Sequence, residues 1–294
     1  MQFNVIFQSM RPSFLLLTPI CVFLGASFVH YQHMSIDYQT LVLALLGATL
    51  AHVSVNTLNE YLDFSNGLDL HTHRTPFSGG SGALPLNPSM AMPVLYTGLI
   101  TLTMTAFIGL IFIWLQGMKI IPIGIAGLLL IITYTKWINR YPVLCLIAPG
   151  LGFGIFMVIG TAIVLGHDFS MSIWAVAAVP FFLVNNLLLL NQYPDIEPDR
   201  AVGRRHIPIV FGISGSNLVY AIFAALAFGS IMLSVSLHLL PTLALLALLP
   251  APLAVYAWRG ARQYGKQIGS HNRYLAANVA VSLLTPLLLG ISLF

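Results

Sequence analysis

Nine apolar stretches of roughly 17 to 25 residues follow one another along this chain, and polar, glycine-containing or proline-containing breaks separate them. A helix of that length can cross the hydrocarbon core of a bilayer. Composition agrees, because 58% of the 294 residues are hydrophobic and 7% are charged, which excludes an ordinary soluble domain. We therefore predict an all-α polytopic membrane protein, a single domain over residues 1–294 with nine transmembrane helices in one bundle around a central cavity. The predicted helices cover residues 12–30, 38–62, 91–115, 118–137, 143–166, 171–193, 214–237, 239–258 and 273–293.

The positions of Lys and Arg predict how this bundle is oriented. With the N-terminus in the cytoplasm, eleven of the twelve basic residues fall in cytoplasmic segments, and Lys119 lies on the other side. The sequence therefore predicts an integral protein of the cell membrane with a cytoplasmic N-terminus. The basic residues are scattered singly through loops, so the net charge of +4 predicts contact with membrane lipid and no binding of nucleic acid.

Six of the eight acidic residues gather in two short windows, at the cytoplasmic ends of the second and sixth predicted helices. The first window runs from Asn56 to Asp69, and the second runs from Asn191 to Asp199. A carboxylate within a membrane helix costs about 2.5 to 3.5 kcal/mol, so each window needs a compensating interaction. The two helices run in the same direction, and we expect the windows to face each other under cytoplasmic loops at about residues 63–90 and 194–213.

The spacing of the first window places several oxygen-bearing side chains on one face of a helix. Asn56, Asn59 or Glu60, and Asp63 recur at i, i+3 or i+4, and i+7. Asp69 follows a helix-ending Asn-Gly pair, where the chain can fold back toward the same place. Such oxygens suit Mg²⁺, which is usually held by one or two carboxylates together with substrate phosphates.

The second window repeats this chemistry with a less regular backbone. Asn191, Asp195 and Asp199 are spaced at i, i+4 and i+8, but Pro194 and Pro198 require the helix to kink or stop inside the motif. For either window alone, a solvated helix end with an Asx cap is the alternative. Two windows on one side of a chain that is otherwise nearly free of acid predict instead a pair of Mg²⁺ sites that hold a phosphate-bearing substrate.

Basic residues on the same side are candidates for binding the phosphates. Arg74 lies in a glycine-rich loop, whose backbone N–H groups can approach phosphate oxygens. Lys136, between the fourth and fifth predicted helices, and Arg204, after the second window, are equally explained as positive-inside anchors. Among these anchors, a functional role is favoured for Lys136, and Arg204 is kept as a diphosphate contact.

The two windows resemble the paired aspartate-rich motifs of the UbiA superfamily of intramembrane prenyltransferases. The resemblance rests on Asn59-Glu60-Tyr61-Leu62-Asp63 running to Asp69, and on Asp195-x-x-x-Asp199 running into Arg200–Arg205. It covers nearly the whole chain, since that family has nine helices with both motifs on the cytoplasmic side. The Gly67-Leu68-Asp69 ending looks most like the branch that prenylates 1,4-dihydroxy-2-naphthoate on the way to menaquinone.

The resemblance implies a Mg²⁺-dependent transfer of a polyprenyl group from a polyprenyl diphosphate to an aromatic acceptor. The implied ligands of one ion are Asn56, Asn59, Asp63 and Asp69, and those of the other are Asp195 and Asp199, with Asn191 beside them. Arg74 and Lys136 would then neutralise the diphosphate. We further predict that Asn191 and Arg204 contact the diphosphate and that the catalytic residues are Asp63, Asp195 and Lys136. Two departures from the family pattern are Glu60, where Asp is usual, and the two prolines of the second window.

Two alternatives remain open on the sequence. Prenylation of 4-hydroxybenzoate, homogentisate or a glycerol-phosphate lipid precursor keeps the reaction and changes the acceptor. A divalent-cation or organic-anion transporter would also use acidic clusters, but it predicts polar residues on both sides of the membrane midplane, whereas the charges here gather at one end.

Overall fold

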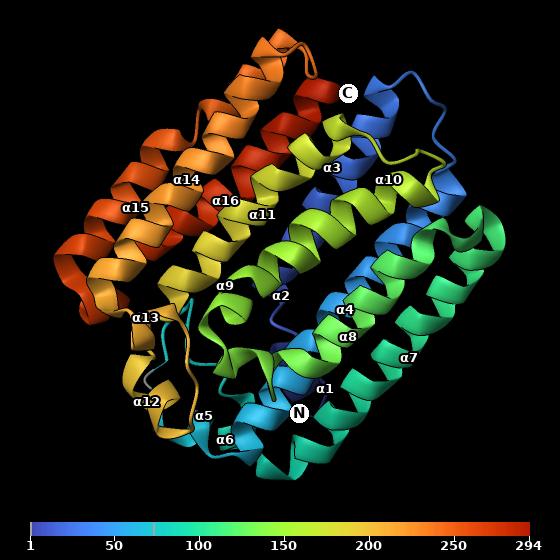
Figure 1. Cartoon of the computed structure of the whole chain (residues 1–294). Coiled ribbons are helices and arrows are strands. Elements are labelled where there is room, and N and C mark those ends of the chain that lie inside the picture. Colours follow the sequence, from blue (N-terminus) through green and yellow to red (C-terminus); the bar gives the residue numbers. More distant parts are fainter. Residues whose placement is uncertain (1, 73) are drawn as a thin grey trace.

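The computed structural model describes residues 2–72 and 74–294, and within these ranges the chain is helical and contains no strand. Long apolar helices make up most of the molecule (Figure 1). The helices of the bundle are α3 (Leu17–Tyr31), α4 (Tyr38–Ser65), α7 (Ala91–Gln116), α8 (Ile121–Tyr134), α9 (Pro142–Gly150), α10 (Gly160–Val164), α11 (Met171–Asn191), α14 (Gly212–Ser236), α15 (Ala251–Tyr264) and α16 (Asn272–Leu293). A π-helical segment, Leu151–Ile159, joins α9 to α10. The short helices are α1 (Gln2–Ser9), α2 (Pro12–Leu15), α5 (Leu68–His71), α6 (Ala83–Leu86), α12 (Ile196–Ala201) and α13 (Ile207–Val210).

Eight helical stretches of the described chain are long and apolar enough to cross a membrane, which confirms the prediction of an all-helical membrane protein. Seven of them match predicted helices one to one. The eighth, Pro88–Tyr134, spans 47 residues and covers two predicted helices. Within it, Gly117 with a φ of 76° ends α7, and α8 has only 14 residues, about 21 Å of helix. Because the hydrocarbon core is about 30 Å thick, the count of nine spans stays a prediction.

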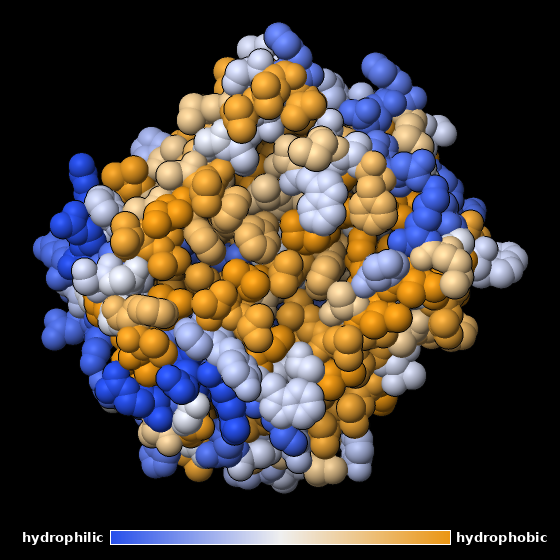
Figure 2. Space-filling view, viewed as in Figure 1, coloured by the Kyte–Doolittle hydropathy of each residue, from blue (hydrophilic) through white to orange (hydrophobic). Residues whose placement is uncertain are grey.

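The outward-facing side chains of the bundle are apolar. On α7, Phe107, Leu110 and Trp114 are 64%, 62% and 83% exposed. Figure 2 shows hydrophobic residues across the middle of one face and hydrophilic residues toward its edges, including the region of α12. An apolar surface of this extent indicates a lipid environment around the middle of the bundle, with water at its ends.

The interior combines apolar packing with a few polar contacts between helices. Phe28 of α3 and Val158 of the π-helical segment are fully buried in the main core. Nearby, Asn186 of α11 donates to the carbonyl of Tyr220 at 2.9 Å, the Tyr220 hydroxyl donates to Asn278 of α16 at 2.9 Å, and Asn278 donates to the carbonyl of Asn186 at 3.0 Å. Hydrogen bonds of this kind hold membrane helices α11, α14 and α16 in register.

Two chain reversals bring the acidic windows to one end of the bundle. After α4, Gly67 with a φ of 82° turns the chain into α5, which carries Asp69. The chain leaves α11 before Pro194, and Asp195 precedes α12, which carries Asp199. The helix therefore stops before Pro194, one of the two outcomes, kink or stop, that the sequence predicted, whereas Pro198 lies in the first turn of α12. Figure 1 shows α5 and α12 near each other at the lower end of the molecule, and the two helices are in contact.

Candidate active site

A cavity of about 740 Å³ opens inside the bundle, and both acidic windows line its polar end. The polar and charged residues there include Arg11, Asn56, Asn59, Asp63, Asp69, Asn191, Asp195, Asp199, Arg204 and His206. The two windows, more than 120 residues apart in the chain, thus share one space. Eight of the ten sequence-predicted site residues lie in this lining, and Arg74 and Lys136 do not.

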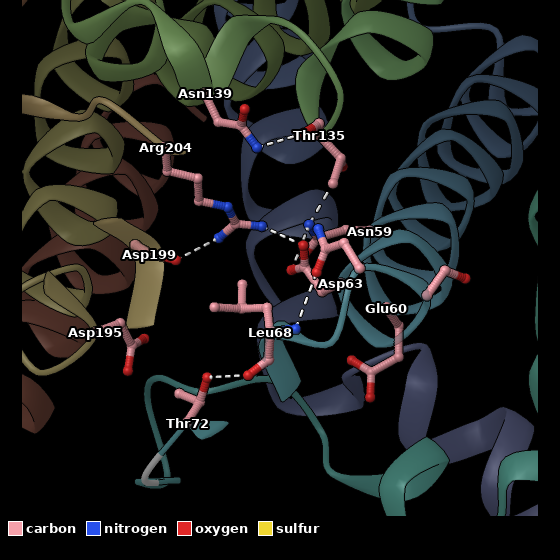
Figure 3. A network of polar contacts seen from close by, with 12 residues as sticks. Asn59, Glu60, Asp63, Leu68, Thr72, Thr135, Asn139, Asp195, Asp199 and Arg204 are labelled. Atoms are coloured by element: carbon pink, nitrogen blue, oxygen red, sulfur yellow. Dashed lines mark hydrogen bonds and ion pairs between the residues drawn. The ribbon is translucent and has the colours of Figure 1, made fainter. Parts of the chain in front are cut away.

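Arg204 links the two windows. Its guanidinium pairs with Asp199 of the second window at 2.9 Å and with Asp63 of the first window (Figure 3). Asp199 also contacts His206 Nε2 at 2.8 Å. Burial disfavours the guanidinium charge, but the two carboxylates more than offset this and raise the pKa of Arg204, so the side chain stays charged. Arg204 is therefore a fixed positive charge between the two windows.

The first window places Asn56, Asn59 and Asp63 on α4, and segments outside this helix hold the two amide side chains. Asn59 Nδ2 donates to Asp63 at 3.0 Å and to the hydroxyl of Thr135 at 3.2 Å. Asn56 Nδ2 donates to the carbonyl of Met10 at 2.9 Å. Both amide groups are therefore held through nitrogen, and the Asn59 oxygen also accepts a long hydrogen bond from Arg11 at 3.5 Å.

Several oxygens at the polar end of the cavity are buried and have no hydrogen-bond partner among the described residues. They belong to Asp69, Asn191 and Asp195, one oxygen from each side chain. Such groups are costly unless a ligand satisfies them. Carboxylate and amide oxygens form a donor set that fits Mg²⁺.

The pKa values of Asp69 and Asp195 also indicate a site for a cation. Burial raises the pKa of Asp69 to about 7, and the nearby Glu60 and Asp63 add to this effect. Burial likewise raises the pKa of Asp195 to about 7, with a contribution from Asp199. Both carboxyls lack a neighbouring cation strong enough to cancel the cost of burial, and a divalent cation would supply one.

Within the described residues, no three His, Cys, Asp or Glu side chains lie close enough together to hold a metal ion by themselves. Mg²⁺ does not require such a cage, because it keeps waters and binds through one or two carboxylates plus substrate phosphates. The polar end of the cavity fits an ion that is completed by its substrate.

Glu60 and Arg11 have roles that the sequence did not resolve. The spacing left Asn59 and Glu60 as alternatives on the ligand face, and the structure places Asn59 at the cavity and Glu60 outside its lining. Glu60 is fully buried and pairs with Arg11 at 3.1 Å. Arg11 reads as a positive-inside anchor in the sequence, and the signal that could have revealed it is the need of a buried Glu60 for a cation.

The rest of the cavity is apolar. On α4 its lining runs from Ala44 to Asp63, about 28 Å of helix. Further walls come from α7, α8 and the segment from α9 to α10, with smaller contributions from α3, α11 and α16. His52 lies in this region, where it hydrogen-bonds to Thr18 at 2.8 Å and packs edge-on against Phe153. The wall also includes Ile125, which is 55% exposed on the lipid-facing surface. An apolar chain could therefore lie along this channel with access from the membrane.

Comparison with known proteins assigns the fold. The model of the UbiA prenyltransferase family matches residues 18–278 of this chain. This chain belongs to the UbiA prenyltransferase family. It is similar to a 1,4-dihydroxy-2-naphthoate octaprenyltransferase from Haemophilus influenzae, with 26% identity over 231 residues that cover 75% of this chain and 73% of that protein.

Solved structures of UbiA relatives share the fold along almost the whole chain. A UbiA homologue from Archaeoglobus fulgidus bound to DMAPP and Mg²⁺ has a TM-score of 0.67 and 17% identity, with 98% of both chains covered. A digeranylgeranylglyceryl phosphate synthase has a TM-score of 0.70 and 14% identity, with 99% of this chain and 98% of that chain covered. The family and its fold identify this protein as a prenyltransferase.

In this UbiA-family prenyltransferase, the other two predicted basic residues lie away from the main cavity. Arg74 is exposed, donates to the carbonyl of Ser81, and lines a smaller neighbouring pocket of about 440 Å³. Lys136 is exposed, whereas Thr135 and Asn139 beside it are buried, and Asn139 lines the cavity. The segment around Lys136 thus reaches the site through its neighbours.

Proposed function

We propose that this prenyltransferase transfers a polyprenyl group from an allylic diphosphate to 1,4-dihydroxy-2-naphthoate, in a Mg²⁺-dependent reaction on the cytoplasmic side of the cell membrane. The observation that carries the proposal is the meeting of both acidic windows around Arg204, at the mouth of an apolar channel. The charged windows suit a diphosphate, and the apolar channel suits a polyprenyl tail.

The two windows supply the ligands. Asn56, Asn59, Asp63 and Asp69 would hold one ion, and Asp195 and Asp199 would hold the other, with Asn191 beside the diphosphate. The unpartnered oxygens of Asp69, Asn191 and Asp195 support this assignment. When bound, the ions stabilise the negative charge that develops on the leaving diphosphate.

Cationic side chains add to this stabilisation. Arg204 and Arg11 line the polar end of the cavity, and their fixed charges would contact the diphosphate without reorganisation. Arg74 and Lys136 stay proposed contacts, and Arg74 lines the adjoining pocket together with Arg11. A shift of the loops that carry Arg74 and Lys136 would be needed to bring them to the cavity.

The apolar channel would shield the allylic carbon from water during the transfer. The C–O bond of the allylic diphosphate breaks with its electron pair on the diphosphate, and an electron-rich ring supplies the pair for the new C–C bond. The attacked ring carbon then loses its substituent, a proton or, at the carboxyl-bearing carbon, carbon dioxide, and the electron pair of that bond restores the aromatic ring. Walls such as Phe153, Phe156 and Leu128 exclude water, which would otherwise capture the allylic cation. Aromatic faces also favour a nearby cation.

The proposed acceptor comes from the name of a relative, a 1,4-dihydroxy-2-naphthoate octaprenyltransferase. The test is incubation of the purified protein with Mg²⁺, a labelled polyprenyl diphosphate and a panel of 1,4-dihydroxy-2-naphthoate, 4-hydroxybenzoate, homogentisate and a glycerol phosphate, followed by mass analysis of the lipid product. We expect a prenylated naphthoquinol product. A product from another acceptor alone would refute the acceptor, and no Mg²⁺-dependent product from any acceptor would refute the proposal.

We also propose nine spans with the N-terminus in the cytoplasm. The distribution of basic residues supports this orientation. Lys119, in the turn between α7 and α8, pairs with Asp168 in the connection from α10 to α11, and Figure 1 shows both segments far from α5 and α12. A cysteine at position 119 should react with an impermeant maleimide from outside intact cells, and one at position 74 should not. Cys21 and Cys145 are buried, so background labelling is expected to be low.

A further inference from the structure

A glycine-rich loop, residues 75–82, lies across the acidic end of the cavity. Gly79, Gly80 and Gly82 have φ values of 79°, 72° and 65°, in the left-handed region that glycine adopts without strain. Gly80 runs so close to Asp69 that an added Cβ would lie 2.9 Å from its Oδ1. The backbone N–H of Gly79 donates to Asp195 Oδ2 at 3.0 Å. One loop therefore touches a carboxylate of each window.

The loop is fastened to α4 by Glu60. Glu60 accepts hydrogen bonds from the backbone N–H of Ser81 at 3.1 Å and from the Ser81 hydroxyl, and it pairs with Arg11 at 3.1 Å. Its side chain is completely buried and does not line the cavity. A buried carboxylate with this many donors is held in one position, and it holds its donors in turn.

The contacts form a path from one window to the other. Ser81 is two residues from Gly79, so the position of Ser81 limits where the Gly79 N–H can lie. That N–H occupies Oδ2 of Asp195, whereas Oδ1 has no partner among the described residues. The loop thus selects which oxygen of Asp195 remains for a ligand.

We propose that Glu60 is a positioning residue. Through Ser81 it holds the glycine loop, so that Gly79 orients Asp195 and Gly80 covers Asp69, and the affinity of the windows for a divalent cation depends on this contact. The inference rests on the proposed function, because it takes the windows as the metal site.

The test uses Mn²⁺ as a probe, with free Mn²⁺ measured by EPR on the purified full-length protein. Ser81→Ala removes one hydroxyl from a residue that does not line the main cavity, and Glu60→Gln removes the charge at nearly constant size. Each should weaken Mn²⁺ binding by about tenfold, the effect of one lost hydrogen bond to a charged group. Because both act on the same contact, the double variant should weaken binding little beyond the stronger single variant.

Trypsin cleavage after Arg74 gives a second readout, since this exposed residue lies at the edge of the loop. Both variants should be cut faster there than the unmodified protein. Ser65→Ala is the matched control. It removes an exposed hydroxyl that donates to the carbonyl of Tyr61 near the end of α4, the helix that also carries Glu60. It should change neither Mn²⁺ binding nor cleavage after Arg74.

The outcomes separate the two proposals. If the unmodified protein binds no Mn²⁺, the proposed metal site is wrong. If it binds Mn²⁺ and Ser81→Ala binds it equally well with unchanged cleavage, the proposed function stands and the role of Glu60 is refuted. Fully additive effects of the two substitutions would also overturn the role of Glu60. Should Glu60→Gln fail to fold, Ser81→Ala alone still decides the question.

Discussion

Arg204 offers the sharpest test of how the two windows are held together. Its side chain is 17% exposed, and the side chains of its partners Asp63 and Asp199 are 6% and 4% exposed. Arg204→Gln would leave both carboxylates in a buried site without their shared cation. Removing one partner of a buried ion pair costs about 3 to 5 kcal/mol. At about 2 °C for each kcal/mol in a chain of this size, we expect Tm in EDTA to fall by about 6 to 10 °C.

Arg200 provides a matched control, because it lies four residues away and pairs with Glu197 at 3.4 Å on the surface, where the two side chains are 53% and 58% exposed. Exposed pairs contribute about 0 to 1 kcal/mol, so Arg200→Gln should shift Tm by no more than about 2 °C. Mg²⁺ should recover part of the loss in Arg204→Gln, since the ion supplies positive charge to the same carboxylates. Equal melting of the two variants in EDTA would refute the reasoning that Arg204 joins the windows.

Three further results are expected. Asp63→Asn or Asp195→Asn should leave the protein folded and reduce Mg²⁺-dependent prenyl transfer, measured with labelled polyprenyl diphosphate, by at least about 100-fold. Turnover near the rate of the unmodified protein would contradict the proposed catalytic role of the substituted aspartate. Burial raises the pKa of Asp69 and Asp195 from 3.8 to about 7, so Mn²⁺ affinity should rise from pH 6 to pH 8. Metal-free stability, which the neutral carboxyls favour, should fall as pH rises from about 4 to about 7 and level off above that, and a flat profile of either quantity would contradict the assigned sign. Gly124 lines the channel, and an added Cβ there would meet nothing within 4 Å. Gly124→Leu should therefore fold and accept dimethylallyl diphosphate, but it should reject long polyprenyl diphosphates. Unchanged use of long chains would place the polyprenyl tail elsewhere.

Helix positions were predictable because long apolar runs leave few alternatives in a membrane chain. The second predicted helix, residues 38–62, begins where α4 begins and differs from its end by three residues. The acidic windows were also found from sequence alone, since carboxylates beside apolar helices are costly and need a reason. The stop at Pro194 followed from the chemistry of proline, which cannot continue the hydrogen-bond ladder of a helix.

Side-chain roles within the windows were less predictable, because they depend on contacts across long sequence separations. Helix spacing could not choose between Asn59 and Glu60, and the choice is made by Arg11, 49 residues before Glu60, and by Ser81, 21 residues after it. Lys136 shows the same limit on a smaller scale. Its segment approaches the site, but its neighbour Thr135 makes the contact with Asn59.

The charges at the polar end of the cavity bear on the number of divalent cations that this end would bind. Arg11 balances Glu60, and Arg204 is shared by two aspartates, whereas Asp69 and Asp195 form no ion pair with a Lys or Arg in the described chain. One divalent cation would neutralise those two carboxylates, but a bound diphosphate brings roughly two to three further negative charges. Uncompensated charge in a buried site is costly, and a second divalent cation removes most of the excess. The balance of charge therefore supports the proposal of two ions.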